Sequence, residues 1–375
     1  MMAKNSGGSM KLKVSRAEFL NGLDRVIGAV AQRGAAYPLL THVLLDVFLT
    51  HMELAATDTM VYARTTFPVV AEMGGRVAVP AERLRGAVDR SGEEISITLK
   101  DGLILSLTGD DRLFDLPCLD AADYPAPFDL AYAPPFGLDH GILPSIVNGL
   151  KHAVSGNQIK SHLCGIRMEF KDKTVTACAT DGHRLSLAAR DFHSAWDLTF
   201  SFTVPSRACT ILAGIDSCIE VSYPEIGSMV QFESAKSDLG VRLLEGDFPN
   251  YRAVIPKDLD KGVTVNTAAL IDALESCGVV AEDAKNKSVQ ITTTAGKLCL
   301  TTLGLNGTAM VTLPYLGDDM EPLRMNSKYF LQAAKSLGGE ELFIKFKDAR
   351  SPILLIPVDH GQWSERLEVI MPMRG

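Results

Sequence analysis

The sequence predicts an α+β fold of three tandem homologous domains, each with two helices packed on antiparallel sheets. The main observation is a repeat: one order of elements begins three times, with "LKVSRAEFLNGLDRVIGAV" from Leu12, "FGLDHGILPSIVNGLKHAV" from Phe136 and "VTVNTAALIDALESCGVVA" from Val263. A second helical pattern and alternating strand patterns follow in each third. A repeat this long indicates tandem domains rather than a solenoid. We expect a disordered, Gly/Ser-rich leader at residues 1–9 and domains at 10–131, 132–256 and 257–375.

The first helix of each third is predicted by apolar residues at helical spacing after a short extended lead. In the first copy one face of the helix carries Phe19, Leu20, Leu23, Val26, Ile27 and Val30. Good N-cap residues precede the three helical runs, namely Ser15, Asp139 and Asn266.

The second helix of each third is predicted in "VAVPAERLRGAV" from Val77, "FTVPSRACTILAGI" from Phe202 and "LRMNSKYFLQAAKSL" from Leu323. Pro80 and Pro205 suit a helix start, because the missing N–H of proline would have no partner there.

The strands read as antiparallel hairpins. "ISITLKDGLILSL" at 95–107 alternates apolar and polar residues around Asp101–Gly102, which is a hairpin turn signal. "ELFIKFKDARSPILLIPV" at 341–358 shows the same pattern.

Composition excludes several classes of protein. No apolar run approaches the roughly 18 residues that a membrane span needs, and no charged start leads into an apolar secretory signal. The seven cysteines are scattered without a Cys-x-x-Cys pair, which argues against a disulfide framework or zinc site and favours a reducing cytoplasm. The histidines form no metal-ligand cluster and no phosphate-binding glycine loop is present, so we expect neither metal nor cofactor. The net charge of −8 excludes a nucleic-acid grip by the whole surface, but not by one basic face.

The stretch "ATDGHRLSLA" at 179–188 places Asp181, His183 and Arg184 within four positions, as an active site could. The first third has "ATDTMVYAR" at the equivalent place, so the Thr-Asp pair predicts turn chemistry. The histidine and arginine occur in one copy only and indicate a surface feature of the middle domain. A hydrolase that uses Asp181 and His183 stays the alternative, although no Ser or Cys nucleophile motif accompanies it.

Three motifs in order carry a family resemblance: "ATDGHRL" at 179–185, "GDFPNYRAVIP" at 246–256 and "VIMPMR" at 369–374. With the threefold repeat, the chain from Met10 to Gly375 resembles the bacterial sliding clamp, the beta subunit of DNA polymerase III. The resemblance implies a non-catalytic, head-to-tail homodimeric ring, with helices lining a hole for double-stranded DNA. It also implies a nucleoid-associated cytoplasmic protein that binds the DNA polymerase III alpha subunit, the clamp loader and other proteins with a clamp-binding motif.

The resemblance further implies three groups of site residues. Lys160 and Arg33 would contact DNA, and Val279 and Val280 would lie in the dimer interface. The Leu, Val, Pro and Met side chains of the third group make an adaptable apolar socket for hydrophobic peptide anchors, with His183 and Arg184 as a polar rim. This peptide-binding pocket comprises Leu163, Thr180, Gly182, His183, Arg184, Leu185, Pro249, Val254, Val369, Met371, Pro372, Met373 and Arg374.

Two places depart from the family pattern. The second motif keeps Arg252 but has Ala253 where the family often has a second arginine, so one pocket wall is less polar. Ser161 and His162 follow Lys160 where the best-known members have tyrosines, which changes the loop expected near DNA. A clamp-like scaffold that has lost DNA function is a third interpretation.

Overall fold

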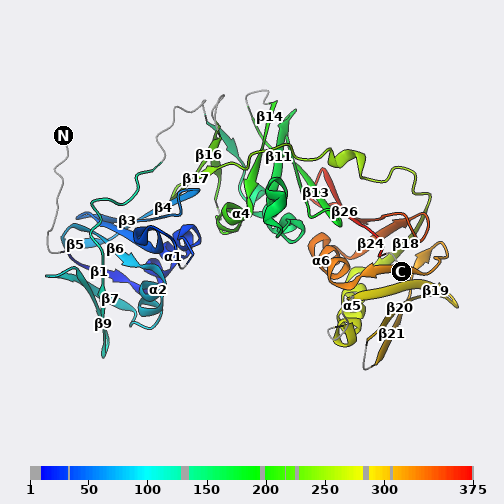
Figure 1. Cartoon of the computed structure of the whole chain (residues 1–375), viewed down its shortest axis with the longest axis horizontal. Helices are drawn as coiled ribbons and strands as arrows, with labels where there is room; N and C mark the ends of the chain where they lie inside the picture. Colours follow the sequence, from blue (N-terminus) through cyan, green and yellow to red (C-terminus); the bar gives the residue numbers. More distant parts are fainter. Residues whose placement is uncertain are drawn as a thin grey trace. The chain divides into compact units, whose positions relative to one another are not determined.

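The computed structural model describes residues 10–32, 34–127, 135–194, 199–215, 217–223, 228–281, 287–304 and 307–373. The leader predicted at 1–9 lies outside them. The chain divides into two compact units, Met1–Pro144 with Arg207–Leu243 and Ser145–Ser206 with Leu244–Gly375. The domain predicted at 132–256 contributes residues to both. Figure 1 shows the elements of each unit.

The described residues contain the six predicted helices, two in each third. They are α1 (Arg16–Val26), α2 (Ala81–Asp89), α3 (Ile142–Leu150), α4 (Ser206–Leu212), α5 (Thr267–Ala281) and α6 (Ser327–Leu337). Five short 3-10 helices accompany them: η1 (Ile27–Ala29), η2 (Pro38–Thr41), η3 (Lys151–Ala153), η4 (Gln158–Leu163) and η5 (Tyr251–Ala253).

The helix starts agree with the sequence in part. Asn266 caps α5, because its side-chain oxygen accepts the backbone N–H of Ala269 at 3.0 Å. Ser15 directly precedes α1 but makes no side-chain cap bond. α3 begins at Ile142, three residues after Asp139. α2 and α4 each begin at the residue after a proline, in agreement with the helix starts predicted at Pro80 and Pro205.

The first unit holds two antiparallel sheets. The 5-stranded sheet has the order β5-β1-β7-β8-β9, from β1 (Lys11–Ser15), β5 (Val70–Met73), β7 (Glu94–Lys100), β8 (Ile104–Gly109) and β9 (Arg112–Pro117). The 8-stranded sheet has the order β10-β15-β16-β17-β4-β3-β2-β6. It comprises β2 (His42–Val47), β3 (His51–Thr57), β4 (Val61–Pro68), β6 (Gly75–Pro80), β10 (Phe136–Leu138), β15 (Ile219–Ser222), β16 (Met229–Glu233) and β17 (Ser237–Arg242).

The second unit repeats this arrangement. Its 9-stranded sheet has the order β14-β11-β12-β13-β26-β25-β24-β18-β22, and its 4-stranded sheet has the order β21-β20-β19-β23. The large sheet comprises β11 (Gly165–Lys171), β12 (Thr174–Thr180), β13 (Arg184–Asp191), β14 (Thr199–Pro205), β18 (Lys261–Asn266), β22 (Leu316–Gly317), β24 (Glu341–Phe346), β25 (Ile353–Pro357) and β26 (Glu365–Ile370). The small sheet comprises β19 (Ser288–Thr294), β20 (Lys297–Leu303), β21 (Thr308–Leu313) and β23 (Leu323–Asn326).

Both predicted hairpins are confirmed. β7 pairs with β8 around Asp101–Gly102, where Gly102 has a φ of 78°, in the left-handed region that glycine adopts at little cost. β24 pairs with β25 in the second.

The cores lie where helix faces meet the sheets. α1 packs on β3 and β4, and α5 packs on β20 and β21 beside α6 (Figure 1). Gly22 allows the close approach of α1, because a Cβ there would lie 2.6 Å from the Phe67 ring. Fully buried Phe19 and Phe330 anchor two of these faces, and burying each side chain contributes roughly 1.5–3 kcal/mol. Among the described residues, no helix is long and apolar enough to cross a membrane.

Candidate peptide-binding site

The Asp-Gly turn between β12 and β13 is closed by its own side chains. Thr180 Oγ1 donates to the carbonyl oxygen of Arg184 at 2.7 Å and accepts the backbone N–H of Gly182 at 3.2 Å. Asp181 Oδ1 accepts the backbone N–H groups of His183 and Arg184 at 2.9 and 3.1 Å. Gly182 has a φ of 90°, which favours glycine. The predicted turn chemistry of the Thr-Asp pair is confirmed.

The same turn occurs between β3 and β4 without the histidine or the arginine. Thr57 Oγ1 donates to the carbonyl oxygen of Val61 at 2.8 Å and accepts the N–H of Thr59 at 3.0 Å. Asp58 Oδ1 accepts the N–H groups of Met60 and Val61 at 2.9 and 2.8 Å. His183 and Arg184 are therefore additions to a turn that folds without them.

Arg184 belongs to the interior rather than to an exposed rim. Only 8% of it is exposed. Its Nε donates to Asp181 Oδ2 at 3.1 Å, and its terminal nitrogens donate to Gln332 Oε1 at 2.6 Å and to the carbonyl oxygen of His152. Its Cζ lies 4.2 Å from the centre of the Tyr329 ring, within cation–π range. The guanidinium thus joins the turn to α6 and η3 and positions the neighbouring residues.

These contacts occupy both carboxylate oxygens of Asp181. One oxygen accepts two backbone N–H groups and the other accepts the Arg184 guanidinium. The His183 ring faces Tyr329, with the ring centres 6.5 Å apart, and its partner is therefore an aromatic ring. This geometry holds a turn in place, and it does not present Asp181 and His183 as an acid–base pair.

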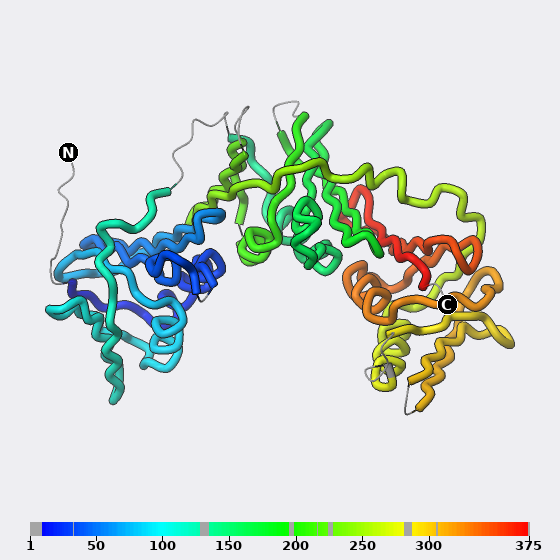
Figure 2. The backbone as a smooth tube through the Cα atoms, viewed as in Figure 1, coloured from blue at the N-terminus to red at the C-terminus, as the bar shows by residue number. Residues whose placement is uncertain are grey.

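β13 brings the motif at 179–185 together with the motif at the C-terminus. Leu185 pairs with Val369 on β26, and the N–H of Met371 donates to the carbonyl oxygen of His183 at 2.9 Å. Figure 2 shows the red C-terminal strand beside the green β13, although the two lie far apart in sequence. The second motif, "GDFPNYRAVIP" at 246–256, covers the same sheet, because Tyr251 packs in one cluster with Leu185 and Val369.

The predicted pocket residues divide into a floor and a surface. Met371 is 41% exposed and Val254 is 50% exposed. Gly182, His183 and Pro249 are also exposed, and Pro372 and Met373 are half-buried. The floor is buried and comprises Leu163, Thr180, Leu185 and Val369. Arg374 lies outside the described residues.

A hollow of about 780 Å³ adjoins the exposed end of this surface. Met371, Pro372 and Met373 form one side of it. The other side was not predicted from the sequence and comprises Gln290, Pro322, Arg324, Ala349 and Arg350. Only the proximity of β19, β23 and the turn after β24 to the C-terminal segment reveals these residues.

Beneath the site, β26 carries a buried charged network. Arg366 is 1% exposed and Glu368 is 0% exposed, and they form an ion pair at 3.5 Å. Glu368 accepts the Ser186 hydroxyl at 2.6 Å and lies 3.2 Å from His152 Nε2. Arg366 donates to the carbonyl oxygens of Leu187 at 3.1 Å and Gly149 at 2.9 Å, and to Ser336 Oγ at 2.5 Å. The network ties β13 and β26 to the helical layer.

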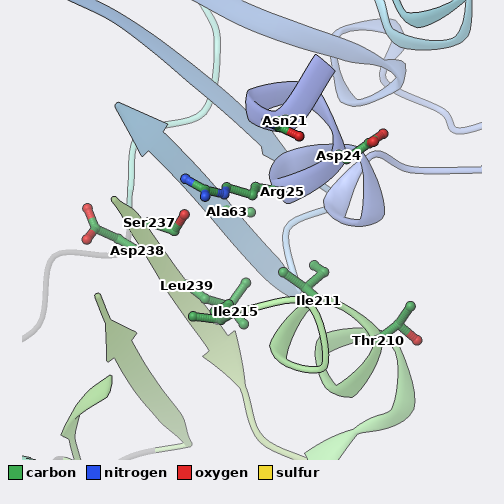
Figure 3. A pocket seen from close by; sticks show the side chains of 11 residues that line it. Asn21, Asp24, Arg25, Ala63, Thr210, Ile211, Ile215, Ser237, Asp238 and Leu239 are labelled. Atoms are coloured by element: carbon green, nitrogen blue, oxygen red, sulfur yellow. The ribbon is translucent and has the colours of Figure 1, made fainter. Parts of the chain in front are cut away.

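The first unit has a hollow at the place that corresponds to this charged network. β17 pairs with β4 so that Leu239 faces Ala63, and β26 pairs with β13 so that Glu368 faces Ser186. The hollow has a volume of about 340 Å³, and Arg25 points into it from α1 toward β17 (Figure 3). Its lining comprises Asn21, Asp24, Arg25, Ala63, Thr210, Ile211, Gly214, Ile215, Ser237, Asp238 and Leu239.

The predicted DNA and dimer residues have separate locations. Arg33 lies outside the described residues. Lys160 is exposed, and a Cβ on Gly182 would lie 3.9 Å from its Nζ, so its ammonium lies beside the turn. Val279 on α5 is 77% exposed and Val280 is half-buried.

The structure offers no metal centre among the described residues, where no three His, Cys, Asp or Glu side chains are grouped to hold an ion. All seven cysteines have free thiols.

Comparisons with known proteins agree with this architecture. Three family models match in order: the N-terminal domain of the DNA polymerase III beta subunit at residues 10–128, the central domain at 138–250 and the C-terminal domain at 252–374. The beta sliding clamp of Synechococcus elongatus is 28% identical over 93% of this chain and 96% of the relative. That of Caulobacter vibrioides is 26% identical over 97% of this chain and 100% of the relative.

Solved structures give the same result. A sliding clamp from Bartonella birtlesii bound to griselimycin superimposes with a TM-score of 0.86 at 27% identity, covering 98% of this chain and 100% of that one. The Bacillus subtilis sliding clamp matches with a TM-score of 0.85 at 20% identity, with the same coverage.

The three matched domains and the paired-strand site define a protein of the DNA-clamp class. The chain belongs to the family of DNA polymerase III beta subunits. It is a sliding clamp rather than a catalytic enzyme, and nothing supports the hydrolase alternative.

Proposed function

We propose that this clamp closes as a head-to-tail homodimeric ring around double-stranded DNA and binds its partners through peptides docked on Met371 and its neighbours. Those partners are the DNA polymerase III alpha subunit, the clamp loader and other proteins with a clamp-binding motif. A protein with this task works at the nucleoid, in the cytoplasm. The observation that carries the proposal is a strand junction between thirds of the chain. It occurs twice, between β4 and β17 and between β13 and β26, and it leaves β9 and β21 as unpaired edges.

The two junctions share one register. The pairs Thr57–Tyr62 and Thr180–Leu185 occupy equivalent positions at the two turns. In the first junction the next residue of β4 faces β17, and in the second the next residue of β13 faces β26. In the last third, the equivalent pair Thr302–Ala309 makes β21 the counterpart of β4 and β13. β21 and β9 are both edge strands.

Pairing β9 of one subunit with β21 of another would repeat the junction between subunits. By the same register, Phe114 would face Met310, as Leu239 faces Ala63. Met310 is 66% exposed and the adjacent Leu113 is 60% exposed, so the pairing would bury apolar surface. Unpaired edge strands with exposed apolar side chains favour association with another chain.

The predicted interface residues support the same edge. α5 packs on β21 and carries Val279 and Val280 at its C-terminal end. The exposed Val279 would add apolar contact beside the paired strands. A dimer that paired β9 with β9, or β21 with β21, would leave the other strand's edge open. The head-to-tail arrangement pairs β9 with β21 at both interfaces of the ring.

The ring is expected to hold DNA by topology rather than by tight binding. Two basic side chains on the helices are already paired: Arg85 with Asp24 at 2.8 Å and Lys335 with Glu275 at 2.6 Å. The remaining phosphate contacts, with Lys160 and Arg33 among them, would be sequence-independent and would weaken as salt rises.

The test of the ring is retention on DNA. The clamp is loaded onto a nicked circular plasmid with its clamp loader and isolated by gel filtration, and the circle is then cut once. We expect the protein to elute with the circle and to leave the linear product. Protein that stays on linear DNA at physiological salt would contradict a topological link.

The DNA contacts need a separate measurement. Neutralising Lys160 and Arg33 together is expected to weaken direct binding to a short duplex and to reduce the slope of log K against log salt by up to about 2. An unchanged slope would show that neither residue contacts phosphate. Peptide affinity measured on the Lys160→Ala variant separates a DNA role from a role beside the turn.

A further inference from the structure

We propose that the hollow beside Met371 binds an aspartate or glutamate side chain of the docked peptide, and that Arg324 and Arg350 hold its carboxylate. This inference rests on the proposed peptide-binding function and adds the chemistry of the segment that the site selects. It makes the two arginines specificity-determining residues next to the apolar anchor sites.

The hollow is continuous with the predicted peptide surface. Met371, Pro372 and Met373 line it, and the N–H of Met373 donates to the carbonyl oxygen of Arg324 at 2.8 Å. Arg324 on β23 faces Gln290 on β19, so a guanidinium and an amide reach the hollow from adjacent strands. A peptide that covers Met371 would therefore pass directly beside Arg324.

Arg350 is positioned by a side-chain turn. Asp348 Oδ1 accepts the N–H groups of Arg350 and Ser351 at 2.8 and 2.9 Å. These backbone bonds lower the pKa of Asp348, with that of Arg350 contributing most. The Asp348 carboxylate thus binds backbone N–H groups of its own turn, and this turn places Arg350 at the hollow.

The charge of the lining is one-sided. It contains two arginines and no acid, in a chain whose net charge is −8. Neither Arg324 nor Arg350 forms an ion pair with a carboxylate among the residues that the structure describes, whereas Arg85, Arg207 and Arg366 each do. A ligand carboxylate would supply the missing counter-charge.

The size and geometry suit a peptide side chain. The volume of about 780 Å³ lies within the usual range of ligand pockets. Guanidinium groups bind carboxylates through two parallel N–H···O bonds, which adds orientation to the charge attraction. Both arginines are exposed, so water and salt will limit the gain to a few-fold for each pair.

The experiment compares matched peptides on matched variants. Two labelled synthetic peptides share their hydrophobic anchors, and one carries Asp where the other carries Asn, with the flanking position scanned in parallel. We expect the best Asp peptide to bind the parent clamp about three- to tenfold more tightly than its Asn counterpart at 50 mM salt. The preference should shrink at 500 mM salt.

The arginine variants assign that preference. The double variant Arg324→Gln with Arg350→Gln is expected to lose it while still binding the Asn peptide as the parent does. The control is Lys171→Gln with Lys297→Gln, which removes the same charge from exposed positions elsewhere in the same unit and should keep the preference.

Four results would overturn the inference, and the last would overturn the proposed pocket as well. The parent could bind the two peptides equally, or the arginine double variant could keep the preference. The double variant could also lose duplex DNA binding in place of the peptide preference, which would assign the arginines to phosphate. If the parent binds neither peptide, the proposed pocket itself fails and this inference fails with it.

Discussion

Replacing Arg366 with methionine is expected to lower the free energy of unfolding of the second unit by about 3–5 kcal/mol, the usual cost of removing one partner of a buried ion pair. Arg366 is 1% exposed and lies 3.5 Å from Glu368, which is 0% exposed. Burial lowers the pKa of Arg366, and Glu368 partly offsets this effect. The two charges are therefore buried away from water, unlike those of a surface ion pair.

The expected loss has two sources. The variant leaves Glu368 buried with only the Ser186 hydroxyl at 2.6 Å and His152 at 3.2 Å. It also removes the guanidinium donors that reach the carbonyl oxygens of Leu187 and Gly149 at 3.1 and 2.9 Å, although the Ser336 hydroxyl still donates to Gly149. A buried acceptor left without a partner costs about 1–3 kcal/mol.

A second variant separates the lost charge partner from the lost packing. Arg366→Met with Glu368→Leu removes both charges and makes the strand resemble β17, where Leu239 occupies the position of Glu368. Apolar replacement of a buried pair is often neutral or stabilising. We expect the double variant to recover most of the loss seen in the single variant.

The assay is urea unfolding followed by circular dichroism, with Arg85→Met as the control. Arg85 and Asp24 pair at 2.8 Å but are about half exposed, so the control should lose less than about 1 kcal/mol. The reasoning is refuted if Arg366→Met matches this control, or if the double variant is less stable than the single one.

Three other perturbations test the site, the ring and one thiol. Met371→Ala should weaken binding of a polymerase-derived peptide by about 1–4 kcal/mol in a fluorescence titration and leave the dimer intact; unaltered affinity would remove Met371 from the site. Val280→Asp should sediment as a monomer, because a charge in an apolar contact costs several kcal/mol; a dimer as tight as the parent would exclude this interface. Burial raises the pKa of Cys118 to about 11, so little of it is thiolate at pH 8, and maleimide should label it much more slowly than the exposed Cys218. Because the folded state binds the thiol proton more tightly, its contribution to the free energy of unfolding is complete below pH 9 and falls as the pH rises to 11. Equal labelling rates for the two thiols would contradict the raised pKa.

The elements of the fold could be predicted from the sequence because their signals are local. The apolar face of α1 and the Asp101–Gly102 hairpin each depend on residues close together in the chain. The Thr-Asp turn is of the same kind, since Asp181 bonds to the next two or three residues. Comparing the two copies of this turn also indicated from the sequence that His183 and Arg184 are not needed to form it.

The surroundings of the site could not be predicted in this way, because they depend on long-range packing. Arg184 was expected at a polar edge, but Gln332 and Tyr329 of α6 enclose it. Arg324 and Arg350 carry no motif, and only the path of the C-terminal segment brings them beside Met373. The pocket residues implied by the family resemblance stay a prediction until peptide binding is measured.

The charged network on β26 has a role that stability alone does not explain, since an apolar pair would hold the strand as well. β26 is buried on both faces, with Arg366 and Glu368 on one and Leu367 and Val369 on the other. A slip of one residue would turn both charges onto the apolar face. A slip of two residues would move Glu368 away from Ser186 and leave its charge without that donor. The network therefore favours this register of β26 against β13, and the register determines where Met371 leaves the sheet, at the proposed peptide site.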